Sequence, residues 1–588
     1  MAVQTVNRIY SNFRGVDFSN SEVNLYRSPD SINMWKNYDN GEGIETRPGM
    51  TLLGEFGSQI FGLFFYKIQD TLQVIVHAGT KLYRWTNYPT MPVEKTEIYS
   101  EMNPKHSQHF IFNSVLFIKD GINYLEYDGE ICKEVVGTVP ITRLGTLPSG
   151  QIYSDDMDYV YQDVNCLTNL RKNGFVADGV STEYHLDAYD LDPASIYIMK
   201  ATINGVEKLE AVDFTVDRKN GIVKLNEAPP KPEDIGLDKG ESTVFITYSK
   251  SNSELANRIK KSTLLVEFDN RIFFSGNQDY PNTVFHTELE DPRYISTQGY
   301  STVGLDMASI KALIPGNDIL WVFKETVQNY SNVYYLTPTI DSEQGKIYPA
   351  VVGNISTGCV STGINFNDDI CFFSVKGLEA IGNTLGNDQI LDHRSSLVDS
   401  KLISNKDYLN VKLAEYRGYL MCLLDSKIFL ADSRNMFEKT TNKAEYEWFY
   451  WELPFNIDFI TEYQNDLYLA NSEGQIFILE GITDNETDIQ SKWTTTKDTF
   501  KYDSYRKITN KRGGTADVKV MNNDSINLKT ITEIRENEIG TYNDSKGYIV
   551  YRVKEKKFKW IQLEFSSNKP FGLFSCTLEA FIGGYVKR

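Results

Sequence analysis

The sequence predicts an all-β protein, and three observations lead to this prediction. Tyr, Phe and Trp contribute 36, 32 and 7 of the 588 residues, so 13% of the chain is aromatic. These residues lie among Val, Ile and Thr in short segments interrupted by Gly, Asn and Asp, which is the composition of β-strands. No long amphipathic run with helix caps occurs. A polar tight turn followed by an apolar strand recurs instead, at a regular interval.

The recurring turns indicate how the strands are organised. Each turn precedes an apolar strand such as Thr71–Val76 or Ile319–Phe323. The turns fall at positions 70, 113, 270, 317, 368, 417 and 465, and their intervals are 43, 157, 47, 51, 49 and 48 residues. A repeat of about this length with a central hairpin is typical of a β-propeller blade. We expect six or seven blades; the alternative is a string of β-sandwiches with evenly spaced hairpins.

The one long interval predicts an inserted domain. It exceeds a blade by roughly 105 residues, which is enough for a small domain. Lys219-Asn220-Gly221 carries the Asn-Gly pair that favours a tight hairpin. The strands expected around it are 195–199, 213–217, 222–225 and 244–248. We therefore expect an N-terminal arm and the first blades in residues 1–150, an inserted β-sandwich in 151–255, and the remaining blades in 256–490.

A change of charge marks the last boundary. Residues 491–588 contain 19 Lys and Arg against 11 Asp and Glu, a balance of +8, whereas the whole chain carries −19 and residues 1–490 therefore −27. The segments 548–553, 558–565 and 578–582 have strand composition, so we expect a basic C-terminal β-domain. The acidic body argues against a general nucleic-acid coat.

The cysteines and the N-terminal sequence predict the cellular context. The six cysteines lie far apart without a Cys-x-x-Cys pair, so we expect reduced, buried thiols rather than a zinc site or disulfides: Cys132, Cys166, Cys359, Cys371, Cys422 and Cys576. The first residues have no apolar run after a basic segment, and no stretch of about 18 apolar residues follows. We expect neither a standard secretion signal nor membrane insertion.

Few residue groups suggest chemistry. His106 and His109 are the only close histidine pair, and their spacing on a strand puts them on opposite faces. Asp187, Asp190 and Asp192 form a carboxylate cluster, which lacks the turn pattern of a calcium loop and is interpreted as a solvated loop. No nucleophile elbow, Walker loop or dinucleotide fingerprint occurs. We expect no catalytic residue, cofactor or metal, and no enzymatic activity.

Two further features are candidates for protein contacts. Basic clusters in the C-terminal domain are either a solvated face or a docking face for an acidic protein surface, which we favour over DNA binding because the chain's own body is acidic. These candidates are Arg506, Lys507, Lys511, Arg512, Lys556, Lys557 and Lys559. The segment Glu447–Trp451 has four consecutive aromatic residues, which cannot share one strand face. Blade core with packing between blades is favoured over an interface anchor.

Several short motifs resemble those of one family. The opening segments are Asn12–Asp17, Ser28–Met34 and Glu45–Met50, the last containing Arg47, Pro48 and Gly49. Five later segments follow: Asn270–Asn277, Asp291–Tyr294, Gly358–Val360, Phe373–Gly377 and Trp448–Trp451. The first of these begins with Asn270 and Arg271, and the second begins with Asp291 and Pro292. Together they are similar to the tail stabilisation or nozzle proteins of short-tailed phages, which extend the portal and adaptor.

The resemblance implies a structural virion protein of the phage tail, assembled in the host cytoplasm. It implies a homo-oligomeric ring, expected to be hexameric, that extends the head-to-tail DNA channel, retains packaged DNA and contacts portal or adaptor proteins and a tail fibre or spike. Double-stranded DNA would pass without specific binding, and an acidic wall would repel its phosphates. The rival hypothesis is a carbohydrate-binding tail propeller, receptor-binding or glycan-cleaving, with exposed Tyr and Trp stacking on sugars.

Overall fold

The fold consists of two compact units in which strands predominate. The computed structural model describes the chain except residues 1–3, 20–22, 42, 69, 154–161, 317, 343–344, 383–389, 405–408, 439–443, 504, 511–512, 521–524, 544–546 and 583–588. Unit 1 comprises residues 1–104, 323–333 and 353–588, and unit 2 comprises 105–322 and 334–352. The helices of the described residues are short: α1 (Ser253–Lys260), α2 (Asp399–Leu402) and the 3₁₀ turns Tyr38–Asn40 and Pro232–Ile235.

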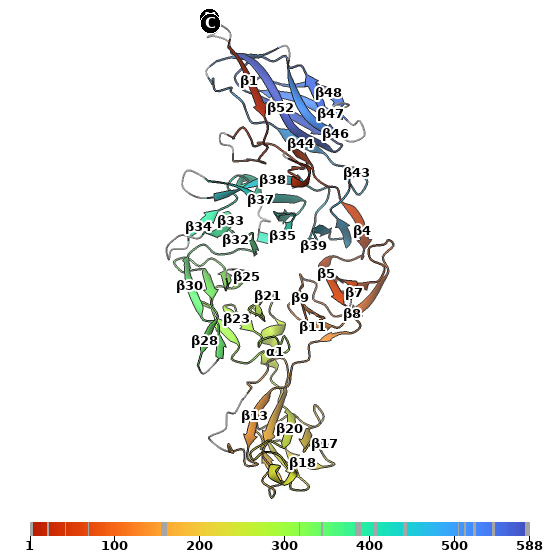
Figure 1. The fold of residues 1–588 in the computed structure, drawn as a ribbon, viewed down its shortest axis with the longest axis vertical. Coiled ribbons are helices and arrows are strands. Elements are labelled where there is room, and N and C mark those ends of the chain that lie inside the picture. The colour runs from red at the N-terminus through yellow and green to blue at the C-terminus, as the bar shows by residue number, and fades with distance from the viewer. Residues whose placement is uncertain are drawn as a thin grey trace. The chain divides into compact units, whose positions relative to one another are not determined.

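Unit 1 contains antiparallel sheets of four strands, nearly all consecutive in sequence (Figure 1). One consists of β5 (Ile60–Ile68), β6 (Thr71–Ala78), β7 (Lys81–Trp85) and β8 (Lys95–Tyr99). A second consists of β31 (Gly363–Phe366), β32 (Asp369–Ser374), β33 (Gly377–Gly382) and β34 (Ile390–His393). In a third, β39 (Phe459–Tyr463), β40 (Asp466–Ala470) and β41 (Gln475–Ile478) are joined by β4 (Thr51–Glu55). The strands β35 (Lys412–Tyr416), β36 (Tyr419–Leu424), β37 (Lys427–Glu438) and β38 (Ala444–Glu452) repeat the pattern at one end of a larger sheet.

Unit 2 repeats the four-stranded pattern. Its sheets are β9 (Gln108–Phe112), β10 (Val115–Lys119), β11 (Tyr124–Tyr127) and β12 (Cys132–Glu134), then β21 (Leu264–Phe268), β22 (Arg271–Ser275), β23 (Thr283–His286) and β24 (Tyr300–Thr302). Residues 310–355 form a further sheet of β25 (Ile310–Gly316), β26 (Ile319–Lys324), β27 (Val333–Leu336) and β30 (Ala350–Ile355). A hairpin of β28 (Thr339–Asp341) and β29 (Gly345–Ile347) is separate. The protein is therefore all-β, built from four-stranded antiparallel sheets of the kind found in β-propellers.

The turns predicted from the sequence connect the first two strands of these sheets. Each turn contains residues with positive φ, a conformation that Asn and Asp tolerate better than most other side chains. These residues are Asp70, Asn113, Asp269, Asn270, Asp318, Asn367, Asp368, Arg417 and Asn465. The predicted turn positions are confirmed apart from Asn317, which lies outside the described residues, and the recurrence arises because each of these sheets begins with a tight hairpin.

Residues 141–249 of unit 2 form two sheets of their own. One sheet has the order β13 (Ile141–Thr146), β14 (Leu170–Phe175), β20 (Val244–Ser249), β16 (Lys200–Ile203) and β17 (Val206–Leu209). The other has the order β15 (Glu183–His185), β19 (Ile222–Leu225) and β18 (Phe214–Asp217). Buried residues of both sheets, including Tyr184, Phe214 and Ile246, form one core, which is the arrangement of a sandwich.

Two details of this region differ from the sequence expectation. Its strands begin at Ile141, before the expected boundary at residue 151. The strand expected at 195–199 is a turn, in which the backbone N–H groups of Ile196 and Tyr197 donate to the Pro193 carbonyl. Ile196 and Ile198 are exposed, so their apolar alternation does not mark a buried face.

The C-terminal residues form two more sheets. The first has the order β44 (Ser491–Thr494), β51 (Ile561–Ser567), β47 (Ser525–Thr532) and β48 (Glu536–Asn543). In the second, β52 (Phe571–Ile582) pairs with β1 (Gln4–Tyr10), β45 (Lys507–Thr509) and β46 (Gly514–Val520), and these extend to β50 (Lys556–Phe558) and β49 (Tyr548–Tyr551). A short hairpin of β42 (Thr483–Asp484) and β43 (Thr487–Asp488) precedes them.

The N-terminal arm joins this domain to a four-stranded sheet within unit 1. Strand β2 (Met34–Trp35) pairs with β38 on one side and with β3 (Ile44–Thr46) on the other. Strand β3 pairs in turn with β52. A single sheet of 12 strands therefore runs from β35 through the arm to the C-terminal domain.

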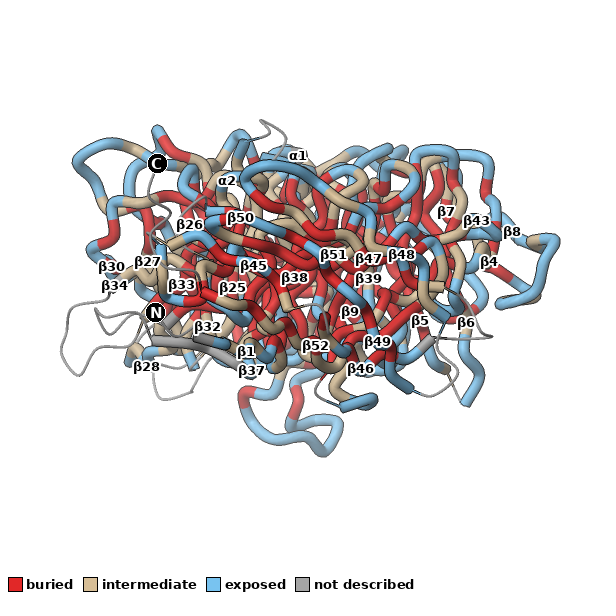
Figure 2. The backbone as a smooth tube through the Cα atoms, turned by 90° about the horizontal axis from the view of Figure 1, so that it is seen from above, coloured by how far each residue is buried: buried red, intermediate tan, exposed pale blue. Residues whose placement is uncertain are grey.

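The aromatic segment Trp448–Trp451 lies in the core on both faces of β38. All four rings are buried, at 0–2% exposed. Trp448 and Tyr450 pack in one hydrophobic cluster, whereas Phe449 and Trp451 pack in another. The favoured interpretation as core rather than interface anchor is confirmed, and β38 lies in a continuous buried region in Figure 2.

The arm depends on close backbone approach at Gly15. The N–H of Val16 donates to the carbonyl of Trp448 at 2.6 Å. A Cβ on Gly15 would lie 1.9 Å from that carbonyl oxygen, and the φ of Gly15 is +95°. Gly41 has a comparable φ of +104°, but a Cβ there would meet no atom within 4 Å.

These two glycines give a matched test of the contact between the N-terminal arm and β38. Both Gly15→Ala and Gly41→Ala force Ala into positive φ, but only Gly15→Ala also displaces the strand β38. We expect Gly15→Ala to cost about 1–3 kcal/mol more of the free energy of unfolding than Gly41→Ala, the usual range for overpacking. Urea unfolding followed by tryptophan fluorescence measures the difference, and equal midpoints would contradict this account.

Candidate functional site

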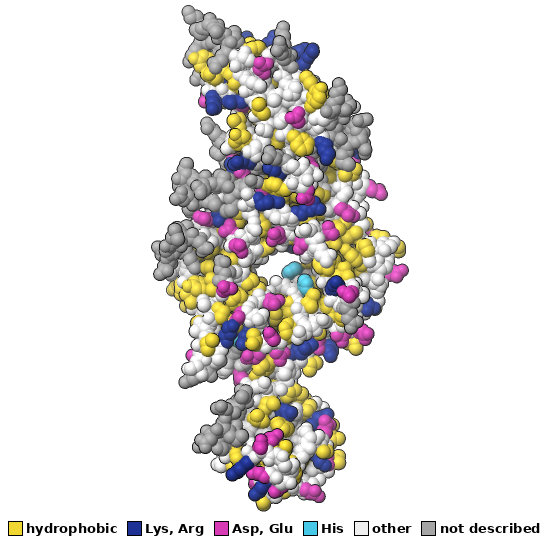
Figure 3. Space-filling model, in the orientation of Figure 1, with side chains coloured by type: hydrophobic (Ala, Val, Ile, Leu, Met, Phe, Trp, Pro, Cys, Tyr) yellow, Lys and Arg dark blue, Asp and Glu magenta, His cyan; other side chains and the backbone are white. Residues whose placement is uncertain are grey.

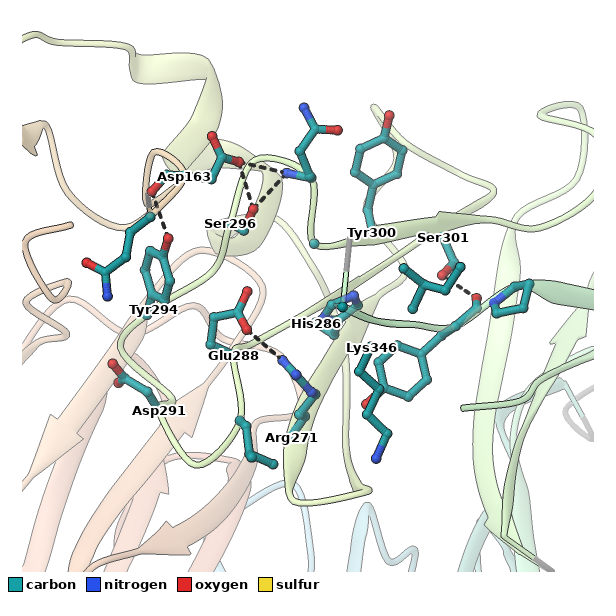
Figure 4. Close-up of a pocket in the computed structure, with 18 of the residues that line it drawn as sticks. Asp163, Arg271, His286, Glu288, Asp291, Tyr294, Ser296, Tyr300, Ser301 and Lys346 are labelled. Carbon is teal, nitrogen blue, oxygen red and sulfur yellow. Dashed lines mark hydrogen bonds and ion pairs between the residues drawn. The ribbon is translucent and has the colours of Figure 1, made fainter. Parts of the chain in front are cut away.

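A cavity of about 1030 Å³ lies wholly in unit 2. Strands β22, β23 and β24, the segment after β23 and the end of the β28–β29 hairpin supply most of its wall. Gln162 and Asp163, which precede β14, complete the lining. Figure 4 shows the side chains converging on this space from these elements.

Arg271 is the most buried charged group of the cavity wall. It is the first residue of β22, directly after the Asp269–Asn270 turn, and only 7% of it is exposed. Its Nη1 donates to the Thr287 carbonyl at 2.7 Å and to Glu288 Oε2 at 3.0 Å, as Figure 4 shows for the Glu288 contact. Its Nε is also buried, and within the described part of the chain no acceptor is placed to bond it.

A second group of paired side chains, Lys346, Asp269 and Tyr348, lies near Arg271. The Tyr348 hydroxyl donates to Asp269 Oδ2 at 2.6 Å, and Lys346 Nζ lies 2.5 Å from the same oxygen. Burial raises the pKa of Asp269, but the hydrogen bonds from Lys346 and Tyr348 outweigh it and hold that pKa below its usual value. Burial and the bond to Asp269 raise the pKa of Tyr348. This Lys346–Asp269–Tyr348 group is therefore charge-balanced internally at neutral pH.

Asp163 and His286 form hydrogen bonds with neighbouring segments of the cavity wall. Asp163 accepts hydrogen bonds from Ser296 Oγ at 2.7 Å, from the Gln298 N–H at 3.2 Å and from Thr297. Burial raises the pKa of Asp163, but these bonds have the larger combined effect and lower it. Burial lowers the pKa of His286, so its ring is neutral near pH 7, with Nδ1 3.1 Å from the Thr287 carbonyl oxygen.

The groups left for a ligand are polar and one is aromatic. Glu288 is 38% exposed at its side chain and engages Arg271 through Oε2. The Tyr300 ring is 45% exposed at the end of β24. The amide of Gln298 and the hydroxyl of Thr302 share the lining, whereas the Ser301 hydroxyl donates to the Tyr348 carbonyl and the Gln162 Oε1 accepts from the Ile141 N–H. This combination is suited to binding a polar, hydroxyl-rich molecule.

The family-like residues of unit 2 come together in the structure. Asn270, Arg271, Asp291 and Pro292 all line a second cavity of about 300 Å³, and Arg271 and Asp291 line the larger one as well. Sequence reasoning missed Asp163, Glu288 and Tyr300. Glu288 lies three residues before the Asp291-Pro292 motif, a proximity that could have indicated it, whereas nothing in the local sequence marks Asp163 or Tyr300.

The family-like residues of the arm lie in unit 1 and have a structural role. Arg47 is 2% exposed and forms a two-pronged ion pair with Asp484, with Nη1 at 2.8 Å from Oδ1 and Nη2 at 2.5 Å from Oδ2. Its remaining donors reach the side-chain oxygen of Asn33 and the carbonyls of Pro48 and Glu452. A Cβ on Gly49 would lie 2.1 Å from the Thr483 carbonyl oxygen.

The basic residues expected at a docking face separate into three groups. Arg506, Lys556, Lys557 and Lys559 are exposed, and Arg506 Nη1 donates to the Lys557 carbonyl at 3.2 Å. Lys507 differs from the expectation because it is fully buried, with Nζ donating to the carbonyls of Tyr502, Tyr505 and Lys559. Burial lowers the pKa of Lys507. Lys511 and Arg512 lie outside the described residues.

The other sequence candidates have ordinary settings. His106 and His109 are both exposed. Asp192 accepts hydrogen bonds from Ser249 and Ser251, and Asp187 accepts one from Tyr248, so these carboxylates fasten loops. Among the described residues no group of three His, Cys, Asp or Glu side chains is placed to hold a metal ion. The six cysteines are free thiols, and all except the half-buried Cys132 are buried.

A histidine in unit 1 is held between two carboxylates. His393, the last residue of β34, has Nε2 2.6 Å from Asp399 Oδ2 and Nδ1 3.3 Å from Glu379 Oε1. Burial lowers the pKa of His393, but the hydrogen bonds to Asp399 and Glu379 outweigh it and raise the pKa to about 9. Its cation therefore ties β33, β34 and α2 together at neutral pH.

This histidine predicts a pH dependence of stability. Because the folded-state pKa lies above the ordinary value of 6.5, its contribution is complete below pH 6.5 and is lost as the pH rises through about 9. We expect the urea midpoint of the wild-type chain to fall between pH 6.5 and 9.5 by more than that of His393→Gln. An identical fall in both proteins would show that His393 contributes nothing.

Comparisons with known proteins found only distant similarity. No family model matches the chain, and no curated protein matches it. Solved structures that are similar to it include the computationally designed Ika8 protein (11% identity, 73% of this chain, 99% of that chain, TM-score 0.31) and BamB from Moraxella catarrhalis (8%, 81%, 97%, 0.32). Sqt1 from Saccharomyces cerevisiae is similar as well (9%, 74%, 99%, 0.31). All three are β-propeller proteins.

Proposed function

We propose that this chain is a structural subunit of a phage tail, forming the nozzle or stabilisation ring that extends the head-to-tail DNA channel. In this proposal copies of the chain assemble into a ring, expected to be a hexamer, which contacts the portal or adaptor and a fibre or spike. The ring retains packaged DNA and lets it pass at ejection without binding it specifically. The chain carries out no chemical reaction.

The observation that carries the proposal is the continuous 12-stranded sheet of unit 1. The sheet links the four-stranded set β35–β38 to the C-terminal domain through β2 and β3 of the arm. The residues that resemble nozzle proteins, Gly15, Asn33 and Arg47 among them, are those that bond the arm into place. Hydrogen bonds along a continuous sheet connect the β35–β38 set to the C-terminal strands more rigidly than a flexible linker would. A subunit that is under mechanical force in a particle requires such a connection.

The same proposal assigns seven blades. In chain order they are β5–β8, β9–β12, β21–β24, β25–β27 with β30, β31–β34, β35–β38, and β39–β41 with β4. Strand β4 comes from the N-terminal part and pairs with β41 from the far end of the repeat. Such pairing is a common way to close a propeller, because it leaves no free sheet edge at the junction.

The charge of the chain supports passage of DNA without adhesion. Residues 1–490 carry −27, and acidic side chains are spread over the face shown in Figure 3 rather than gathered in one place. DNA phosphates are repelled by such a surface, whereas a basic wall would bind them with a salt-dependent affinity. The exposed basic residues of the C-terminal domain would contact the acidic body of a neighbouring subunit.

Immunogold labelling of intact, DNA-filled particles tests the proposal. We expect label at the head-to-tail axis, and we expect a deletion strain to produce particles that lose their DNA. Label confined to peripheral fibres, absence of label from every particle, or normal DNA retention and infection in the deletion strain would each contradict the proposed role.

The basic face can be tested separately in vitro. We expect Lys556→Glu combined with Lys559→Glu to reduce self-association at low salt, because both exposed cations would become anions facing an acidic partner. The matched control is Lys219→Glu combined with Lys239→Glu, two exposed lysines of the inserted domain. Sedimentation velocity at ionic strengths of about 0.01 and 1 M, where the Debye lengths are about 30 and 3 Å, measures the effect. Equal loss in both pairs would contradict a docking role for this face.

A further inference from the structure

The large cavity of unit 2 has the dimensions of a ligand site. At about 1030 Å³ it lies at the upper end of the roughly 300–1,000 Å³ typical of small-molecule sites. It is lined by ordered strands and by a segment that Asp163 fastens with several hydrogen bonds. The cavity is therefore largely formed before any ligand arrives.

One buried donor in the wall has no partner. Arg271 is 7% exposed, and its Nε is buried without an acceptor in the described part of the chain. Arg271 lines both the large and the small cavity, so a ligand in either one would lie beside its guanidinium group.

Acceptors lie beside this donor. Glu288 uses Oε2 for Arg271 at 3.0 Å, and its side chain is 38% exposed. The exposed amide of Gln298 offers both a donor and an acceptor, whereas the Gln162 Oε1 already accepts a hydrogen bond from the Ile141 N–H. Hydroxyl groups both donate and accept hydrogen bonds, so a ligand rich in hydroxyls matches this mixture better than an acceptor-only anion.

The cavity lining also includes two exposed apolar side chains. Tyr300 is 45% exposed and Leu289 is 55% exposed, and both are lining residues. Tyr300 is the first residue of β24, and in Figure 4 it lies on the opposite side of His286 from Glu288. A tyrosine ring beside hydrogen-bonding groups can contact the C–H face of a sugar while its polar neighbours bond the hydroxyls.

The charge of the lining restricts the ligand further. The carboxylates are Asp163, Glu288 and Asp291, whereas the cations are Arg271 and Lys346. Both cations already face carboxylates, Glu288 and Asp269 respectively. The wall therefore has no free positive charge to attract a phosphate or sulfate, and it favours a neutral or amine-bearing molecule.

We propose that this cavity binds a neutral or amine-bearing oligosaccharide, with Arg271, Glu288 and the glutamine amides bonding its hydroxyls and Tyr300 contacting a sugar face. The site gives the chain a glycan-recognition function in addition to the proposed structural role. It does not depend on that role, because a purified chain can bind a sugar whether or not it belongs to a particle.

The test is binding of the purified full-length chain to a printed array of bacterial and mammalian oligosaccharides, followed by calorimetric titration of the strongest neutral ligand. We expect Tyr300→Ala to weaken binding roughly three- to tenfold through loss of the ring contact, and Glu288→Gln to weaken it by a similar factor. Tyr330→Ala is the matched control, since Tyr330 is 52% exposed and lies outside the cavity lining. We expect its affinity to equal that of the wild type.

Three results would overturn the proposal. The first is an array on which no oligosaccharide binds above background. The second is binding that neither Tyr300→Ala nor Glu288→Gln weakens, which would place the site elsewhere. The third is binding confined to sulfated or sialylated sugars and abolished by high salt, which would show an electrostatic anion site. Because these readouts use purified protein, they are separable from the immunogold result.

Discussion

Unit 1 depends on the buried ion pair of Arg47 and Asp484, which holds the N-terminal arm in place. Arg47 places five N–H groups among Asp484, Asn33 and two backbone carbonyls in a buried site. Removing one partner of such a buried pair leaves the other charge uncompensated, which typically costs several kcal/mol. The pair stands at the point where β3 ends and the chain turns toward β4, so it fixes both the 12-stranded sheet and the sheet that contains β41.

This arrangement accounts for the location of the motifs that resemble nozzle proteins. Two open strand edges, on β38 and on β52, are covered by β2 and β3 respectively. Uncovered edges would leave backbone donors and acceptors available to other chains. The glycines and the arginine of the arm are therefore explained by backbone proximity and charge pairing, and no ligand is needed to account for them.

The candidate site of unit 2 depends on a different principle. Most of its charged groups are already paired, as in the Lys346–Asp269–Tyr348 group and the Arg271–Glu288 pair. Paired charges give a wall a definite shape with little net field, which suits recognition by hydrogen bonds more than by charge attraction. The exposed Tyr300 and the unpartnered Nε of Arg271 distinguish this wall from an ordinary surface loop.

The sequence by itself determined the strands and the turns of the repeat, because Asn and Asp at positive φ and alternating apolar residues act locally. It also indicated the aromatic core of β38. It gave the wrong structure at 195–199, where alternation occurs without burial, and it placed Lys507 on a surface from which it is absent. Only the tertiary structure decided that Arg47 meets Asp484 and that Asp163, Arg271 and Tyr300 line one cavity. These residues are far apart in the chain, and their proximity is set by sheet pairing and core packing, which no local pattern encodes.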